Sequence, residues 1–154
     1  MKTRNGEFNF KNKIKSPANF NNWRFVYSLS NRAKADNDDA DKAFGLFKSC
    51  WTALWIKVDE PGFITVEDGH VEDWKKEISK DVEKNGKPQI VMLFFQKFEE
   101  KMYAELKRFM TKELKLPSQV VRKRTLSSPQ PARNMSAASK IILQMNAKLG
   151  MPLW

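Results

Sequence analysis

Apolar and polar residues follow two different periods along this chain, and the two periods alternate. Apolar residues three and four positions apart predict helices that bury one face, and short β-rich or continuously apolar runs predict strands. We expect strands over residues 23–28, 63–66, 90–95 and 119–126. We expect one helix to begin within the acidic stretch 36–41. We expect three more helices over residues 71–84, 102–114 and 136–149.

This alternation predicts an α/β fold with an open, mainly parallel sheet and helices on both faces. Residues 90–95 are continuously apolar, as in a central strand that is buried on both faces. In such sheets, ligands bind beyond the carboxyl ends of the strands. A chain of 154 residues has room for one sizeable core, so we assign residues 1–20 to a lead-in or linker and residues 21–154 to one domain.

Positive charge is concentrated in the last third of the chain. The net charge is +10, and residues 1–100 carry 17 Lys and Arg against 16 Asp and Glu. Residues 101–154 carry 11 Lys and Arg against 2 Asp and Glu. A concentrated excess favours a polyanionic partner at a defined place, and a solvated basic face is the alternative.

Two pairs of polar residues on the predicted helices could bind a nucleotide. Tyr103 and Lys107 are four positions apart, and so are Gln144 and Lys148, so each pair shares one helix face. An aromatic ring at the start of a helix can stack on a base, and a lysine one turn later can reach a phosphate. From the spacing alone, packing of Tyr103 and solvation of the other three side chains are the commoner outcome.

Motifs for catalysis and for metal binding are missing from the sequence. One cysteine (Cys50) and one histidine (His70) cannot build a zinc site alone, and the aspartates of residues 36–41 depart from the calcium-loop pattern. There is no phosphate-binding glycine loop and no nucleophile elbow, so we expect no enzymatic activity and no intrinsic cofactor. The lack of a long apolar run or a secretory signal, with a single cysteine, predicts an intracellular protein of the cytoplasm or the nucleus.

Three short segments of the last third resemble, in order and spacing, the MID region of the Argonaute/Piwi family. They are Pro-Ser-Gln-Val-Val at 117–121, Arg-Thr-Leu-Ser at 124–127 and Gln-Met-Asn-Ala-Lys-Leu-Gly at 144–150. Tyr103 and Lys107 fall where the family has Tyr-x-x-x-Lys, and the Arg-Thr-Leu-Ser run is similar to the Piwi clade. The chain departs from the family at Met151, where a second glycine usually follows Gly150.

The resemblance implies a Rossmann-like MID domain that holds the 5′-monophosphate of a small guide RNA in a piRNA-like silencing pathway. Tyr103 would stack on the first base. Gln144 would replace a second helix lysine, and in the family a Mg²⁺ ion then helps to neutralise the phosphate. The residues implied in binding the phosphate, or in supporting its pocket, are Lys107, Gln119, Gln144, Asn146 and Lys148. The loop implied in inspecting the first base consists of Gln96, Lys97, Phe98, Glu99, Glu100, Lys101 and Met102.

The implied partners are a guide RNA and the PAZ and PIWI domains of the same parent protein. In the family the PIWI domain contributes more of the phosphate pocket, so we expect this chain alone to be a monomer that binds weakly and does not cleave RNA. Two alternatives stay open: a protein-interaction domain of the same fold with an unused pocket, and a nucleotide-dependent enzyme on a generic doubly wound sheet.

Overall fold

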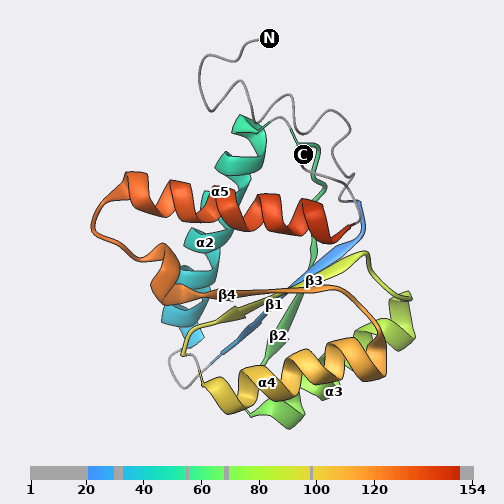
Figure 1. The fold of residues 1–154 in the computed structure, drawn as a ribbon. Coiled ribbons are helices and arrows are strands. Elements are labelled where there is room, and N and C mark those ends of the chain that lie inside the picture. The colour runs from blue at the N-terminus through green and yellow to red at the C-terminus, as the bar shows by residue number, and fades with distance from the viewer. Residues whose placement is uncertain (1–20, 30–32, 55, 68–69, 98, 150–154) are drawn as a thin grey trace.

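Four parallel strands form one open sheet at the centre of the computed structural model, which describes residues 21–29, 33–54, 56–67, 70–97 and 99–149 (Figure 1). The strands are β1 (Trp23–Ser28), β2 (Gly62–Val66), β3 (Ile90–Phe95) and β4 (Ser118–Arg122), in the spatial order β2-β1-β3-β4. All neighbouring pairs are parallel, which confirms the Rossmann-like α/β class. The predicted lead-in, residues 1–20, lies outside the described residues.

Helices cover both faces of this sheet. One face is covered by α2 (Ala33–Ala53) and α5 (Pro131–Lys148). The other is covered by α3 (Val71–Asn85) and α4 (Glu100–Arg108), which continues as the π-helix η1 (Phe109–Leu114). A short 3-10 helix, η2 (Lys123–Leu126), joins β4 to α5. As a result, the two helices that flank the edge strand β4, α4 and α5, lie on opposite faces of the sheet.

The central strand β3 belongs to both hydrophobic cores. Ile90, Met92 and Phe94 pack under α2 and α5. Val91, Leu93 and Phe95 pack under α3 and α4. All six residues are buried, which confirms the strand predicted from the continuous apolar run. Burying each large apolar side chain contributes about 1.5–3 kcal/mol, so β3 contributes strongly to the stability of both cores.

Four predicted boundaries were wrong by two residues or more. Strand β4 ends at Arg122 rather than residue 126, because its partner β3 ends at Phe95, which is paired with Arg122. Helix α5 begins at Pro131 rather than residue 136, because proline is favoured in the first turn of a helix, where its missing N–H is not needed. Helix α4 begins at Glu100 rather than residue 102, with an acidic residue suited to the helix N-terminus. Helix α2 begins at Ala33, ahead of the acidic stretch.

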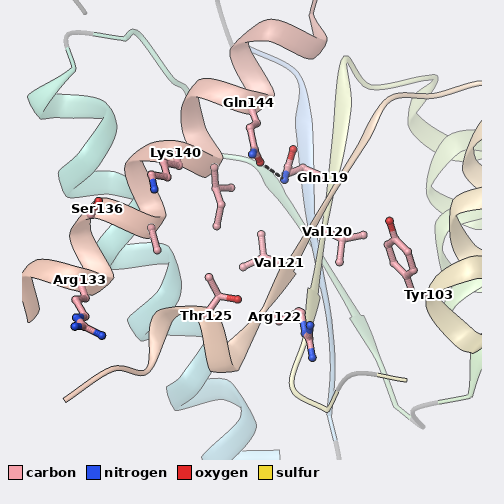
Figure 2. A pocket seen from close by; sticks show the side chains of 12 residues that line it. Tyr103, Gln119, Val120, Val121, Arg122, Thr125, Arg133, Ser136, Lys140 and Gln144 are labelled. Atoms are coloured by element: carbon pink, nitrogen blue, oxygen red, sulfur yellow. Dashed lines mark hydrogen bonds between the residues drawn. The ribbon is translucent and has the colours of Figure 1, made fainter. Parts of the chain in front are cut away.

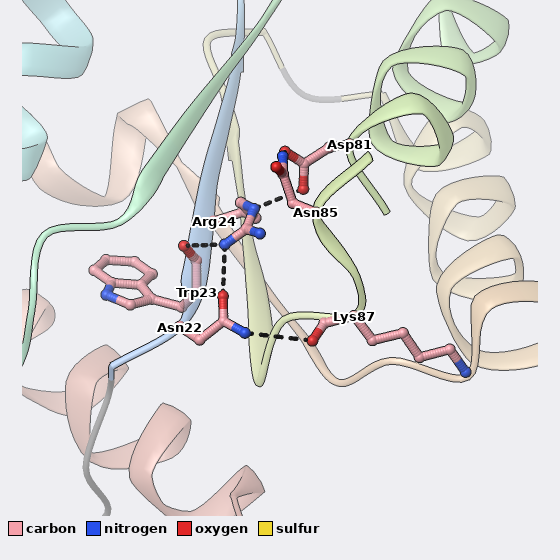
Figure 3. Close-up of polar contacts among 6 residues, drawn as sticks. All are labelled: Asn22, Trp23, Arg24, Asp81, Asn85 and Lys87. Carbon is pink, nitrogen blue, oxygen red and sulfur yellow. Dashed lines mark hydrogen bonds and ion pairs between the residues drawn. The ribbon is translucent and has the colours of Figure 1, made fainter. Parts of the chain in front are cut away.

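The amino ends of the strands are held by a polar network around Arg24 (Figure 3). The Arg24 side chain is nearly buried, and its Nε lies 2.6 Å from Asp81 Oδ2 of α3. Asn85 donates to the other carboxylate oxygen of Asp81, and Arg24 Nη1 donates to Asn22 Oδ1. A buried charge needs such partners, so this network ties β1 to α3 at the start of the sheet.

Candidate phosphate-binding site

Two lysines from different helices meet at the first residue of β4. Lys107 of α4 donates from Nζ to the Ser118 carbonyl oxygen (3.2 Å) and to Ser118 Oγ (2.8 Å). Lys148 of α5 donates from Nζ to the same carbonyl oxygen at 2.7 Å. Because β4 is the edge strand, helices from opposite faces of the sheet can both reach this point.

The two ammonium groups lack anionic partners. No carboxylate of the described residues forms an ion pair with Lys107 or Lys148. Burial lowers the pKa of Lys107 below its usual value, and burial together with the nearby charge of Lys107 lowers the pKa of Lys148. One carbonyl dipole cannot neutralise two cations, so this point favours an anion.

A pair of amides extends the site. Gln119 Nε2 donates to Gln144 Oε1 at 3.0 Å, drawn as the dashed line in Figure 2. Gln119 is only 6% exposed, and its Oε1 is buried without a hydrogen-bond partner among the described residues. Inverting an amide exchanges its donor and its acceptor, so the pair can offer either to a ligand.

A groove of about 690 Å³ continues from this amide pair along β4 (Figure 2). Tyr103 of α4 lies on one side of β4, and α5 forms the opposite wall. The groove has an apolar part made by Val120, Val121 and Ile141. Its basic residues are Arg122, Arg133 and Lys140. An aromatic ring, an apolar wall and donors at one end are the features expected of a nucleotide site.

The fold brings five of the predicted site residues to this region. They are Tyr103, Lys107, Gln119, Gln144 and Lys148. Tyr103, Gln119 and Gln144 line the groove, and Lys107 and Lys148 meet beside it at Ser118. Asn146 is fully buried on another face of α5 and does not line the groove. The sequence predicts a ligand beyond the carboxyl ends of the strands, whereas the lysines meet at the amino end of β4 and the groove follows that strand.

The predicted inspecting loop is shorter than the sequence indicated. Glu100, Lys101 and Met102 form the first turn of α4, so only Gln96, Lys97 and Glu99 precede the helix. Phe98 lies outside the described residues. None of the described residues of this segment lines the groove.

Some residues of the site were not predicted from the sequence. Ser118, Arg133 and Lys140 were missed. The helical period offered a signal for Lys140, which is four positions before Gln144 and so shares its face. Ser118 has no comparable signal, because its contacts join segments 11 and 30 positions apart in the chain.

The implied Mg²⁺ ion would need oxygen ligands near Gln144. The described part of the chain has no cluster of three or more His, Cys, Asp or Glu side chains that could hold a metal. The oxygen atoms near Gln144 are amide oxygens, and the one on Gln119 has no partner among the described residues. Mg²⁺ prefers oxygen ligands and is often held through substrate phosphates, so these residues fit an ion that arrives with the phosphate.

Within the described ranges, no helix is both long and apolar enough to span a bilayer.

Known sequences match this chain over most of its length. A family model described as the Piwi domain matches residues 90–154. Protein argonaute-3 of Drosophila melanogaster is 28% identical over 107 residues, which cover 70% of this chain and 12% of that protein. Piwi-like protein 1 of Gallus gallus is 27% identical over 133 residues, which cover 86% of this chain and 14% of that protein. The chain therefore spans only a small part of the length of these relatives.

Solved structures share the fold. Drosophila Piwi superposes with a TM-score of 0.76 at 17% identity, covering 88% of this chain and 18% of that one. The Arabidopsis thaliana AGO5 MID domain has a TM-score of 0.58 at 18% identity and is covered over 94% of its length, against 87% of this chain. The N. crassa QDE-2 AGO MID domain has a TM-score of 0.56 at 16% identity, covering 82% of this chain and 96% of that domain. Sequence and fold together identify the chain as a relative of the Argonaute/Piwi proteins, similar to the MID region of the Piwi clade.

Proposed function

We propose that this chain binds the 5′-monophosphate end of a small guide RNA and is not itself a catalyst. The observation that carries the proposal is the meeting of two ammonium groups, with no carboxylate of the described residues paired to them, next to Gln119, which lines a groove with an aromatic ring. A terminal monophosphate carries about 1.5 to 2 negative charges at pH 7, which two lysines balance. A phosphate inside the RNA chain carries one charge and is linked on both sides, so it fits this end of the groove less well.

Each side chain then has a role. Lys107 and Lys148 bind the phosphate by charge-assisted hydrogen bonds, and Gln119 and Gln144 donate to it after their amides rearrange. Tyr103 stacks on the first base. We place the chain in a piRNA-like silencing pathway, as a monomeric unit that works with PAZ and PIWI domains, because its relatives are an argonaute and a Piwi-like protein. Asn146, buried in α5, supports the pocket only indirectly.

A divalent cation would reinforce this site. Bound beside the phosphate, Mg²⁺ supplies the positive charge that a glutamine at position 144 does not. The amide oxygens of Gln119 and Gln144 are the candidate protein ligands for this ion. We therefore expect tighter binding of a 5′-monophosphate with Mg²⁺ than with a chelator present, in parallel titrations at constant ionic strength.

The proposal is tested by titrating the ¹⁵N-labelled domain with uridine 5′-monophosphate. We expect micromolar-to-millimolar binding, with chemical-shift changes centred on the backbone amides of Lys107, Ser118 and Gln119. Uridine 3′-monophosphate is the matched control, because it has the same charge and base but presents the phosphate from the other end. Uridine without a phosphate reports the contribution of stacking alone.

Equal shifts with all three ligands, or none with any of them, would sink the proposal. That result would favour the protein-interaction domain with an unused pocket.

A further inference from the structure

We propose that Ser118 is a further phosphate-binding residue: its carbonyl oxygen holds both lysines when no phosphate is bound, and its hydroxyl donates to the phosphate when one is bound beside them. This inference rests on the proposed function, since it needs a phosphate at the lysine pair. Ser118 is 4% exposed, so its position is set by the fold rather than by solvent.

The direction of the Ser118 carbonyl follows from the parallel ladder. Val91 of β3 donates to the carbonyl oxygen of Pro117 at 3.1 Å, so that carbonyl faces the sheet. Successive carbonyls of a strand point in opposite directions. The next carbonyl, on Ser118, therefore faces the open edge of β4, where Lys107 and Lys148 both reach it.

The Ser118 hydroxyl has a proton to give. Its Oγ accepts from Lys107 Nζ at 2.8 Å, and a hydroxyl can accept and donate at the same time. No oxygen of the described residues accepts the hydroxyl proton. A phosphate oxygen bound to the Lys107 ammonium would therefore lie within reach of that proton.

Binding a phosphate need not break the contacts of the two lysines with Ser118. Each ammonium carries three donors, so Lys107 and Lys148 can keep a hydrogen bond to Ser118 and use the others for the phosphate. A pocket that is organised before its ligand arrives loses less conformational freedom on binding. In the protein without phosphate, the Ser118 carbonyl oxygen thus occupies the place that an anion would take beside the two lysines. In the complex, the Ser118 hydroxyl binds the phosphate directly.

The test compares Ser118→Ala with Ser118→Thr, which keeps the hydroxyl and suits a strand. We expect Ser118→Ala to bind uridine 5′-monophosphate about three- to tenfold more weakly, since it loses one hydrogen bond to a charged group. Its affinity for uridine should not change. Ser118→Thr should bind the monophosphate about as well as the native chain does. Ser79→Ala in α3 makes the same chemical change outside the groove and should have no effect.

A second measurement follows the ammonium group of Lys107 by NMR. Loss of the Oγ acceptor should lower the pKa of Lys107 further in Ser118→Ala, and Ser118→Thr should restore it. Unchanged monophosphate affinity in Ser118→Ala overturns the inference, and so does an equal loss for monophosphate and nucleoside, which marks a structural defect. If the native chain itself does not prefer the monophosphate, the proposed function fails and the inference falls with it.

Discussion

At the scale of single residues, the site depends on two cations that are kept partly out of water. Burial disfavours the charged form of a lysine, so Lys107 and Lys148 lower the stability of the empty protein. Both keep partners through Ser118, which limits that cost. Binding an anion removes the penalty, so ligand affinity and fold stability oppose each other at these positions.

The lowered lysine pKa values predict how binding depends on pH. Affinity for uridine 5′-monophosphate should fall as pH rises through the lowered pKa values, below the usual lysine value of 10.5. It should also weaken below about pH 6, where the phosphate takes up its second proton. Titrations from about pH 5.5 to about pH 10 should therefore give an optimum between these limits. An affinity that is constant up to the alkaline end would contradict the prediction.

The same shifts predict how stability depends on pH. In the interval between the lowered folded pKa values and the unfolded value, the unfolded chain binds more protons than the folded one. The free energy of unfolding should therefore rise with pH across this interval. The control is Lys107→Met with Lys148→Met, which keeps the apolar stems but should lose this rise in denaturant titrations.

The sequence predicts most of the residues that the fold brings together at the candidate site, but not Ser118. The pairs Tyr103–Lys107 and Gln144–Lys148 follow from the helical period, which is local information. Ser118 acts through a contact between two helices and a strand, and a lone serine before a glutamine has no pattern that distinguishes it. Position in the folded sheet, not residue type, gives it this place.

At the scale of elements, order and type were predictable and boundaries were not. The continuously apolar run of residues 90–95 predicts a buried strand, and β3 confirms it. The end of β4 depended on where β3 ends, which the sequence of β4 does not contain. The π-helix η1 was read as ordinary helix because its apolar positions fit both periods.

The end of η1 contains a strained residue. Lys115 has φ 54° and ψ 49°, in the left-handed region, and ends the helix just before the turn into β4. That region costs a residue with a side chain about 1–2 kcal/mol and costs glycine little. We expect Lys115→Gly to raise the free energy of unfolding by about 0.5–1 kcal/mol in denaturant titrations, after the larger entropy of glycine in the unfolded chain is subtracted.

Lys112→Gly is the matched control for this prediction. Lys112 is an exposed lysine inside η1, so the same change should lower the free energy of unfolding by about 1 kcal/mol. If both substitutions destabilise the protein equally, the left-handed residue is not a source of strain.

At the scale of the whole molecule, the positive charge of the last third of the sequence gathers in one part of the fold. The basic last third folds into α4, β4 and α5, which together surround the groove. The sequence alone could not place this charge, because α4 and α5 lie on opposite faces of the sheet and their lysines come together at β4 only in the fold.

This arrangement predicts a difference in salt dependence. Each phosphate neutralised in a single strand contributes about −0.7 to the slope of log affinity against log salt concentration. A short RNA with a 5′-monophosphate should therefore show a steeper slope than uridine 5′-monophosphate, because the basic residues of the groove meet further phosphates. Fluorescence titrations from about 50 to about 300 mM KCl measure both slopes. Equal slopes would mean that only the terminal phosphate is held.

Hydrogen bonds among Asn21, Asn22 and Gln89 at the amino ends of the strands make the two ends of the described chain mechanically different. Asn21 and Asn22 both donate their backbone N–H to Gln89 Oε1, and Gln89 returns a hydrogen bond from its own N–H to Asn22. A force applied through a tether at Asn21 acts on these hydrogen bonds and on the paired strands β1 and β3. A force applied at Leu149 acts directly on the last turn of α5, which contains Lys148. We therefore expect tension at Asn21 to leave the affinity for a 5′-monophosphate unchanged and tension at Leu149 to lower it.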